Sequence, residues 1–174
     1  MQTITDSEII VNRVAQSGII TLDLEKYYPE TNIVSFDLKD FLFMGMILKE
    51  KEFRAALKEH NWETYQQQYV AIVCSADAIV PMWAYMLVAA YLTPIAKRFV
   101  FGSPDTLLTL LYAEALSQID LETYRNKRVV IKGCGSKTIP EAAYTEITRL
   151  LQPLVKSLMY GEPCSTVPIY KATV

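Results

Sequence analysis

The chain has 174 residues, of which 51% are hydrophobic and 21% are charged, and its formal net charge is −2. This composition excludes a disordered or collagen-like chain, and without a basic stripe nucleic acid is not an expected partner. The length suits one domain, and the hydrophobic content is enough for a buried core. We therefore predict a single folded domain over residues 1–174.

The cysteines and the first residues bear on the cellular compartment. Three cysteines, an odd number, do not make a disulfide framework. The opening residues, MQTITDSEII, lack the basic region and the apolar run of a secretory signal. We therefore expect a reducing, cytoplasmic setting.

The first half of the chain predicts two helices and two strands. A short helix is expected over residues 7–16, and a longer one begins at Leu48 and ends near Asn61. Between them, GIITLDL (residues 18–24) and NIVSFDL (residues 32–38) have the pattern of strands. The turn-like YYPET separates these two strands, which predicts a hairpin with a long loop.

The second half of the chain alternates short apolar strands with helices. In chain order we predict strand 69–74, a helix from near Pro81, strand 98–102, helix 103–119, strand 127–133 and helix 139–158, with a kink or interruption of the last helix at Pro153. This order is typical of an α/β fold with a mostly parallel sheet and helices on its faces. The N-terminal strands would add antiparallel at one edge, and Pro163 and Pro168 argue against a central strand near the C-terminus. We detect no internal repeat.

One stretch, AIVPMWAYMLVAAYLTPIA (residues 78–96), contains no charge and is long enough to cross a bilayer. However, Pro81 and Pro94 lie near its two ends, Asp77 adjoins it, and no second apolar span is present to pair with it. We therefore expect a helix buried in the domain, and no membrane partner.

The three cysteines suggest a thiolate site. Cys74 and Cys134 each follow an apolar strand, and ligands of open α/β sheets bind beyond the carboxyl ends of the strands. Cys164 would join them if the chain returned to that edge after the last helix. With Asp77, Glu162, water or substrate completing the set, three thiolates would hold zinc or an iron–sulfur cluster. The competing interpretation is three packing cysteines, because no C-x-x-C pair is present.

The loop GCGSKT (residues 133–138) suggests a second kind of site. Because it precedes a predicted helix, its backbone N–H groups would bind an anion. The residues concerned are Gly133, Gly135, Ser136, Lys137 and Thr138. The loop matches neither the Walker pattern nor the dinucleotide-binding pattern, so a tight turn ahead of a helix is the competing interpretation.

Two single residues have structural interpretations beside functional ones. Asp77 is either the N-cap of the following helix or a site residue, and capping preference favours the former. His60, the only histidine, ends a helix, where a cation is favourable. No serine nucleophile elbow is present, so a Ser–His hydrolase is not predicted.

Three blocks of the sequence resemble a known family. They are DFLFMGMILKEKEFRAALKEHNW (residues 40–62), CSADAIVPMWAYMLVAAYLTPIAK (74–97) and MYGEPCSTVPIYK (159–171). Over nearly its whole length the chain resembles an uncharacterised bacterial family catalogued as domain of unknown function 2480. The family has no established activity or catalytic residues. The resemblance implies a role near iron–sulfur cluster assembly or sulfur trafficking, because family members are associated with iron–sulfur assembly genes.

One leading function and two alternatives follow. The leading hypothesis is an accessory protein in iron–sulfur or sulfur metabolism, with iron–sulfur assembly proteins as partners. The first alternative is a small enzyme that binds an anionic ligand at residues 133–138. The second is a noncatalytic interaction module whose apolar surfaces pair with a partner or with a second copy as a homodimer. The sequence does not decide whether the chain is an enzyme.

Overall fold

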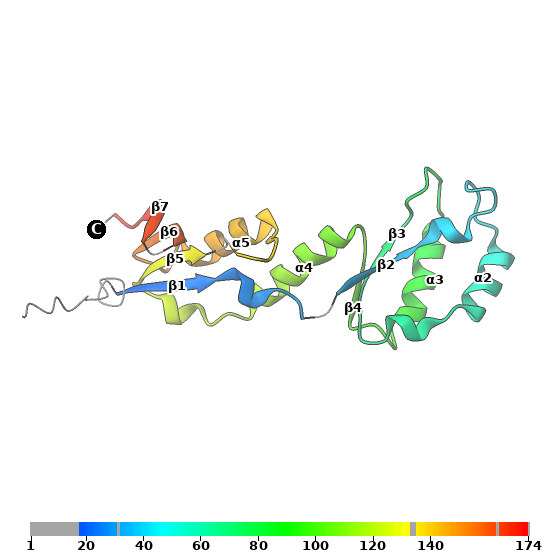
Figure 1. Cartoon of the computed structure of the whole chain (residues 1–174), viewed down its shortest axis with the longest axis horizontal. Coiled ribbons are helices and arrows are strands. Elements are labelled where there is room, and N and C mark those ends of the chain that lie inside the picture. The colour runs from blue at the N-terminus through cyan, green and yellow to red at the C-terminus, as the bar shows by residue number, and fades with distance from the viewer. Residues whose placement is uncertain (1–17, 31, 133–134, 163, 174) are drawn as a thin grey trace, which may run out of the picture. The chain divides into compact units, whose positions relative to one another are not determined.

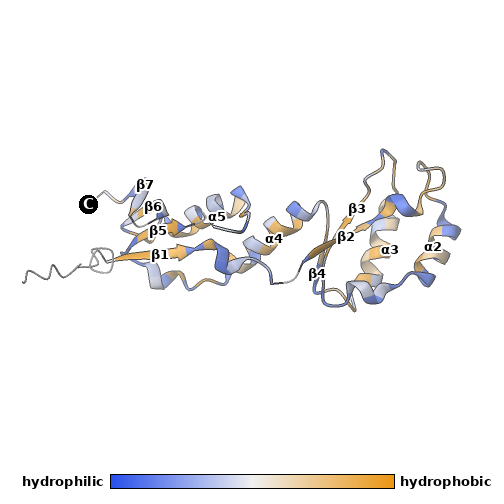
Figure 2. Ribbon diagram, viewed as in Figure 1, coloured by the Kyte–Doolittle hydropathy of each residue, from blue (hydrophilic) through white to orange (hydrophobic). Residues whose placement is uncertain are grey.

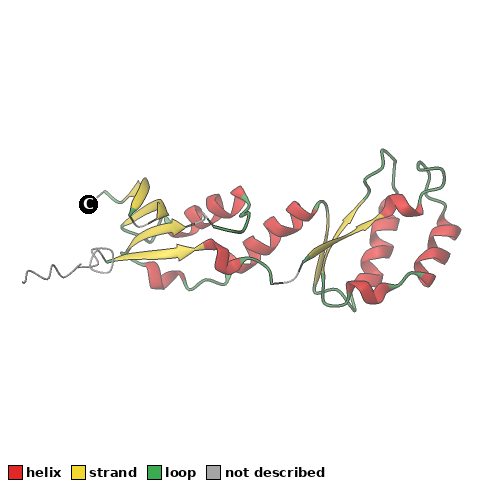
Figure 3. Cartoon of the chain, viewed as in Figure 1, coloured by secondary structure: helices red, strands yellow, loops and turns green. Residues whose placement is uncertain are grey.

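The computed structural model describes residues 18–30, 32–132, 135–162 and 164–173. Backbone contacts divide the chain into two compact units. Unit 1 comprises Met1–Lys26 and Gln118–Val174, and unit 2 comprises Tyr27–Ser117. Both combine helices with a mostly parallel sheet, which confirms the α/β class (Figures 1 and 3). A single domain over residues 1–174 stays a prediction.

Unit 2 contains a three-stranded parallel sheet in the order β2-β3-β4. Its elements are β2 (Ile33–Asp37), α2 (Glu50–Glu59), β3 (Tyr69–Val73), α3 (Met82–Leu92), β4 (Arg98–Phe101) and α4 (Pro104–Ser117), with 3₁₀ helices η2 (Leu38–Phe41) and η3 (Trp62–Tyr65). Alternate residues of β3 face opposite sides of the sheet. Val70 and Ile72 pack in a core with α2 and α3, whereas Ala71 packs against Leu107 of α4. The central strand is therefore buried on both faces.

Unit 1 contains a four-stranded sheet in the order β1-β5-β6-β7. Its elements are η1 (Leu24–Tyr27, which continues into unit 2), β1 (Ile19–Asp23), η4 (Leu121–Tyr124), β5 (Arg128–Lys132), α5 (Glu141–Leu151), β6 (Ser157–Glu162) and β7 (Ser165–Lys171). The first three strands are parallel, and β7 pairs antiparallel with β6. Pro168 lies in this edge strand, where a missing N–H is tolerated.

Several predicted elements differ from those observed. The N-terminal strands do not form a hairpin: β1 pairs in parallel with β5, and β2 with β3. The antiparallel edge lies instead at β7. The helix predicted over 139–158 is interrupted near Pro153 as expected: it ends at Leu151 and does not resume, and the chain continues as β6. The helix predicted over residues 7–16 lies outside the described residues.

Two helix predictions near prolines can be compared directly. Ser103 caps α4 as expected, since its hydroxyl accepts the N–H of Thr106 at 3.2 Å. In the charge-free stretch 78–96, the helix extends only from Met82 to Leu92. No helix in the described part of the chain is long and apolar enough to cross a membrane.

The two units repeat one backbone plan, so the expectation of no internal repeat is wrong. Residues 62–102 align with residues 121–161 without a gap. The identical pairs include Glu63/Glu122, Thr64/Thr123, Tyr65/Tyr124, Pro81/Pro140, Tyr85/Tyr144, Pro94/Pro153 and Gly102/Gly161. The strand registers match as well: β2-β3-β4 begins with Ile33, Tyr69 and Arg98, and β1-β5-β6 begins with Ile19, Arg128 and Ser157.

The hydrogen bonds of the turns repeat in the same way. The N–H of Gln67 donates to the Ile95 carbonyl at 2.8 Å, and the N–H of Asn126 donates to the Leu154 carbonyl at 2.9 Å. Gln67 and Asn126 also share the left-handed backbone conformation, with φ of 56° and 58°. The repeat is therefore one of backbone geometry as well as of sequence.

Candidate functional site

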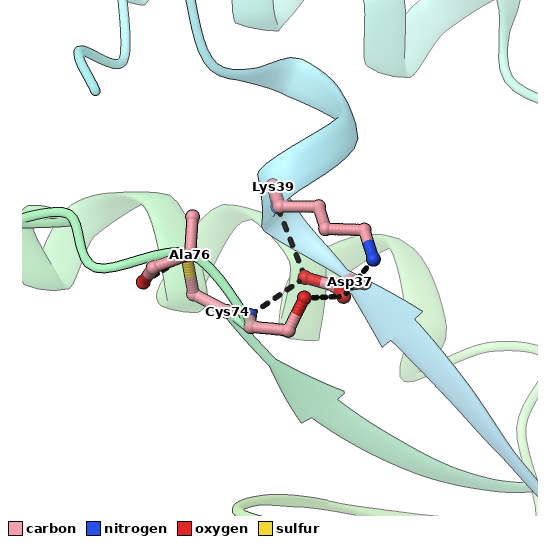
Figure 4. Close-up of polar contacts among 5 residues, drawn as sticks. Asp37, Lys39, Cys74 and Ala76 are labelled. Carbon is pink, nitrogen blue, oxygen red and sulfur yellow. Dashed lines mark hydrogen bonds and ion pairs between the residues drawn. The ribbon is translucent and has the colours of Figure 1, made fainter. Parts of the chain in front are cut away.

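Asp37 organises the carboxyl ends of β2 and β3 in unit 2 (Figure 4). Its Oδ1 accepts the N–H of Ser75 and the N–H of Lys39, each at 3.0 Å. Its Oδ2 accepts the Ser75 hydroxyl at 2.6 Å and lies 3.5 Å from the Lys39 ammonium. This carboxylate therefore ties the turn after β3 to the end of β2.

The charge state of Asp37 follows from these contacts. Burial raises the pKa of this carboxyl, but the hydrogen bonds from Ser75 and Lys39 and the Lys39 charge outweigh burial and lower the pKa overall. Asp37 is thus held as an anion whose oxygens already have donors. Such a group stabilises a turn and is poorly suited to general acid or base chemistry near neutral pH.

Cys74 and Tyr85 lie beside this carboxylate. The Cys74 thiol is partly buried and donates to the Ala76 carbonyl at 3.7 Å. Burial raises the pKa of Tyr85, and the nearby Cys74 and Asp37 raise it further. The phenol therefore stays protonated at neutral pH.

In unit 1, the loop after β5 corresponds to the turn after β3, and it contacts a different carboxylate, that of Glu25. The N–H of Lys137 donates to Glu25 Oε1 at 2.7 Å, and a Cβ added to Gly135 would clash with the Glu25 carboxylate. The predicted anion loop thus already holds an anion, which is a side chain of the same chain. Ser136 and Thr138 are exposed, and Gly133 lies outside the described residues. Binding of an external anion at this loop stays a prediction.

The predicted thiolate site is not assembled among the described residues. Cys74 and Asp77 follow β3 in unit 2, whereas exposed Cys164 lies between β6 and β7 in unit 1. Cys134 lies outside the described residues, but β5, the strand before it, belongs to a different sheet from β3. The expectation that Cys74 and Cys134 follow strands of one sheet is therefore wrong. In the described part of the chain, no group of three His, Cys, Asp or Glu residues could hold a metal ion.

Two single-residue expectations can be checked: the Asp77 cap is wrong, and His60 ends its helix as expected but does not carry a charge there. Asp77 is exposed and does not cap α3, whose N-cap is Pro81 with no side-chain cap. His60 is the C-cap of α2, but burial among aromatic rings lowers its pKa, so it is neutral and not a cation. Its ring centroid lies 5.4 Å from Phe36 and 4.9 Å from Trp62, and Nε2 has no hydrogen-bond partner among the described residues.

A second feature of unit 2 is a set of exposed apolar residues on α3, in the loop before it and at the end of β4. We call Ile79, Met82, Met86 and Phe101 the α3 patch; these residues are exposed by 93, 67, 71 and 64%. Phe101 joins the group through Tyr85, whose ring centroid lies 4.9 Å from that of Phe101. Figure 2 shows α3 in orange and pale colours, whereas α5 carries blue turns.

The internal repeat supplies a control for the α3 patch. The counterparts of Ile79, Met82 and Met86 in unit 1 are Thr138, Glu141 and Thr145, which are also exposed but are polar. The inward residues of the two helices correspond: Ala84, Val88 and Leu92 match Ala143, Ile147 and Leu151, all buried. The two helices therefore share an inner face and differ on the outer face.

Sequence reasoning missed both Asp37 and the α3 patch. The signal for Asp37 was the repeated pattern of FDLK and LDLE, in which Asp37 and Asp23 occupy one position. The signal for the patch was the spacing of Met82 and Met86, one helical turn apart in a helix that lacks a polar face.

Comparison with known proteins identifies a family without a known activity. A family model described as "Protein of unknown function (DUF2480)" matches residues 8–172. No curated protein and no solved structure matches the chain. The resemblance noted in the sequence is thereby confirmed, and the chain belongs to the DUF2480 family of proteins of unknown function.

Proposed function

We propose that this chain is a noncatalytic protein-interaction module that binds its partner through the α3 patch. The observation that carries the proposal is the contrast between α3 and α5. At equivalent exposed positions, α5 and the loop before it have Thr138, Glu141 and Thr145, whereas α3 and the loop before it have three large apolar residues. A helix that is apolar all round is typically covered on every side.

The energetics favour a covered surface. Scattered exposed apolar residues are normal, but a contiguous group marks an interaction site. Full burial of one such side chain contributes about 1.5–3 kcal/mol, so the α3 patch could contribute several-fold that amount to binding. Methionine also adapts its shape to a partner, because its side chain is unbranched and flexible.

The other two functions have less support. The thiolate site of Cys74, Cys134 and Cys164, and with it a role in iron–sulfur metabolism, stays a prediction, and the described residues offer no trio of metal ligands. The anion-binding enzyme stays a prediction as well. In its loop, the N–H of Lys137 already donates a hydrogen bond to the Glu25 carboxylate.

The proposal is tested by partner retention on three forms of the full chain. The first is the wild type, and the second is Met82→Glu with Met86→Thr, which gives α3 the residues of α5. The third is the control Val167→Glu, which places a charge at an exposed apolar position of unit 1. Each form is co-expressed with a differently tagged wild-type copy and purified from cells.

We expect at least one protein, either a second copy or another protein, to be retained by the wild type and by Val167→Glu and lost from the double variant. Circular dichroism and thermal melting must show that all three forms are folded. If folded wild type and folded double variant retain the same proteins, the α3 patch is not the binding surface.

A further inference from the structure

We infer that the partner is a second copy of this chain, and that the two β4 strands pair antiparallel, edge to edge, about a two-fold axis. This inference rests on the proposed function, because the same arrangement would cover both α3 patches. It follows from the edge of β4, from the direction of its backbone groups and from the face on which α3 lies.

The open edge of β4 is the first observation. In unit 1 the corresponding strand, β6, is covered by β7, which pairs with it antiparallel. In unit 2, no strand of the described residues pairs with the outer side of β4. The repeat therefore shows what type of neighbour this position accepts, and unit 2 does not supply that neighbour itself.

The side chains near this edge repeat the contrast. In unit 1, Ile169 of β7 lines a cavity of about 280 Å3 together with Tyr144 and Tyr160. Tyr85 and Phe101 form the equivalent aromatic pair in unit 2, and Phe101 remains largely exposed. An added antiparallel strand would bring side chains onto this pair, as β7 does in unit 1.

The backbone direction gives the register. The N–H of Gly102 donates to the Ile72 carbonyl of β3 at 3.1 Å, so it points inward. Because backbone groups alternate in direction along a strand, those of Phe99 and Phe101 point to the open edge. In a two-fold pair centred on Val100, Phe99 lies opposite Phe101 of the second copy, and both residues can exchange hydrogen bonds.

The face of the sheet then brings the two α3 helices together. Phe99 packs in the core beneath α2 and α3, and Phe101 contacts Tyr85 of α3, so both side chains lie on the α3 face. A two-fold axis perpendicular to a continuous sheet leaves both α3 helices on that same face, next to each other. Tyr85 contacts Phe101 at the β4 edge, so the Tyr85 side of α3 faces the axis. Met82 lies one turn before Tyr85 and Met86 directly after it, so the α3 patch borders the axis and would be covered there by the α3 helix of the second copy. This contact would add the side-chain area that a short strand pair lacks for a stable interface of about 800 Å2 per partner.

One contact opposes this pairing and sharpens the test. The Arg98 guanidinium donates to the Phe99 carbonyl at 3.2 Å and pairs with Glu114 at 2.9 Å. It therefore occupies one acceptor of the open edge, as charged residues on edge strands often do. Ser157 stands at this position in unit 1, where the edge is covered. Releasing the acceptor with Arg98→Ser should strengthen pairing.

The experiment measures mass against concentration by analytical ultracentrifugation of the full chain. We expect a monomer–dimer equilibrium whose Kd rises by about tenfold or more in the Met82→Glu, Met86→Thr variant. Arg98→Ser should lower the Kd, and Val167→Glu should leave it unchanged. Hydrogen–deuterium exchange should show slower exchange at residues 98–102 as protein concentration rises, with no such change in β7.

The outcomes separate this inference from the proposed function. A wild-type chain that is monomeric at every concentration overturns the inference, and so does a dimer without added protection at residues 98–102. In either case, loss of another retained protein from the double variant would leave the proposed function standing. If the double variant neither changes the Kd nor loses a retained protein, both are wrong.

Discussion

Helices α3 and α5 occupy equivalent positions in the two units, yet only α5 has the polar outer face expected of a helix at a protein surface. Their inner residues correspond one for one, from Ala84 and Ala143 to Leu92 and Leu151. The shared inner face shows what each unit needs in order to fold. The outer faces differ: α5 exposes polar side chains to solvent, whereas α3 exposes large apolar side chains that the folding of unit 2 does not require.

The largest expected effect tests the shared inner face. Leu92→Ala and Leu151→Ala each remove a fully buried side chain at the same position of the repeat. We expect each to lower the free energy of unfolding by about 2–5 kcal/mol, because each leaves a cavity. Urea denaturation followed by circular dichroism measures the change. A cost for Leu151→Ala far below that for Leu92→Ala would break the equivalence of the two cores.

The strands and helices that the sequence predicted well are those with strong local signals. The run YVAIVC, followed by an apolar helix between Pro81 and Pro94, is such a case, and so is α4 with its Ser103 cap. Strand partners are set by contacts between distant residues, so the pairing of β1 with β5 was missed. Two similar apolar strands joined by a turn-like segment predicted a hairpin, because nothing local shows that one unit is inserted between them.

The candidate site was harder to predict because its residues are ordinary in type. Cysteines are reactive and can bind metals, which suggested a shared site, but Cys74 and Cys164 belong to different units. Asp37 is one acidic residue among many, and its role depends on Ser75, which is far away in sequence. The repeat gives a weak sequence signal because its identities lie mostly at turns and core positions, while the surface residues between them differ.

A second prediction compares the two aspartates at the strand ends. Asp37 accepts hydrogen bonds from Ser75 and from Lys39, whereas Asp23 accepts the N–H of Glu25 at 3.1 Å. Asp37→Ala should therefore cost about 1–3 kcal/mol of stability, and Asp23→Ala about 1 kcal/mol. Equal costs in urea denaturation would show that the Ser75 contact adds nothing.

The same aspartate carries a pH dependence. The pKa of Asp37 is lower in the folded chain than its ordinary value of 3.8. As the pH falls below that value, the unfolded chain binds the proton first, and the contribution of Asp37 to stability is lost. When the pH is lowered from 5 to below 3.8, wild type should lose more stability than Asp37→Ala. Parallel pH profiles for the two forms would contradict this role.

A third prediction concerns His60, whose counterpart in unit 1 is Ile119. Burial holds the pKa of His60 below its ordinary value of 6.5, so stability should fall as the pH drops below 6.5, where the unfolded chain is protonated first. His60→Ile should remove this dependence and the cost of burying Nε2 without a partner, about 1 kcal/mol. Thermal melting at pH 8 and pH 5 tests this. An unchanged pH dependence would mean that His60 is not its source.

The smallest expected effect concerns the left-handed residues that precede β3 and β5. Gln67→Gly should stabilise the chain by about 0.5–1 kcal/mol, because glycine adopts a positive φ without strain. Asn126→Gly should gain less, because asparagine tolerates this conformation better than glutamine. Melting temperatures of the two variants give the comparison. A loss of stability in both would show that the side chains, and not the backbone, determine these turns.

The central claim, that the α3 patch becomes covered when the chain associates, is tested most directly by the oxidation rates of its methionines. Dilute peroxide oxidises exposed methionines, and mass spectrometry resolves each site. Met44 and Met46 are exposed by 76 and 59% and lie outside the α3 patch, so they serve as internal controls. We predict that Met82 and Met86 oxidise more slowly as protein concentration rises, while Met44 and Met46 do not change. Constant rates at Met82 and Met86 over the whole concentration range would contradict the claim that the α3 patch is covered by a second copy.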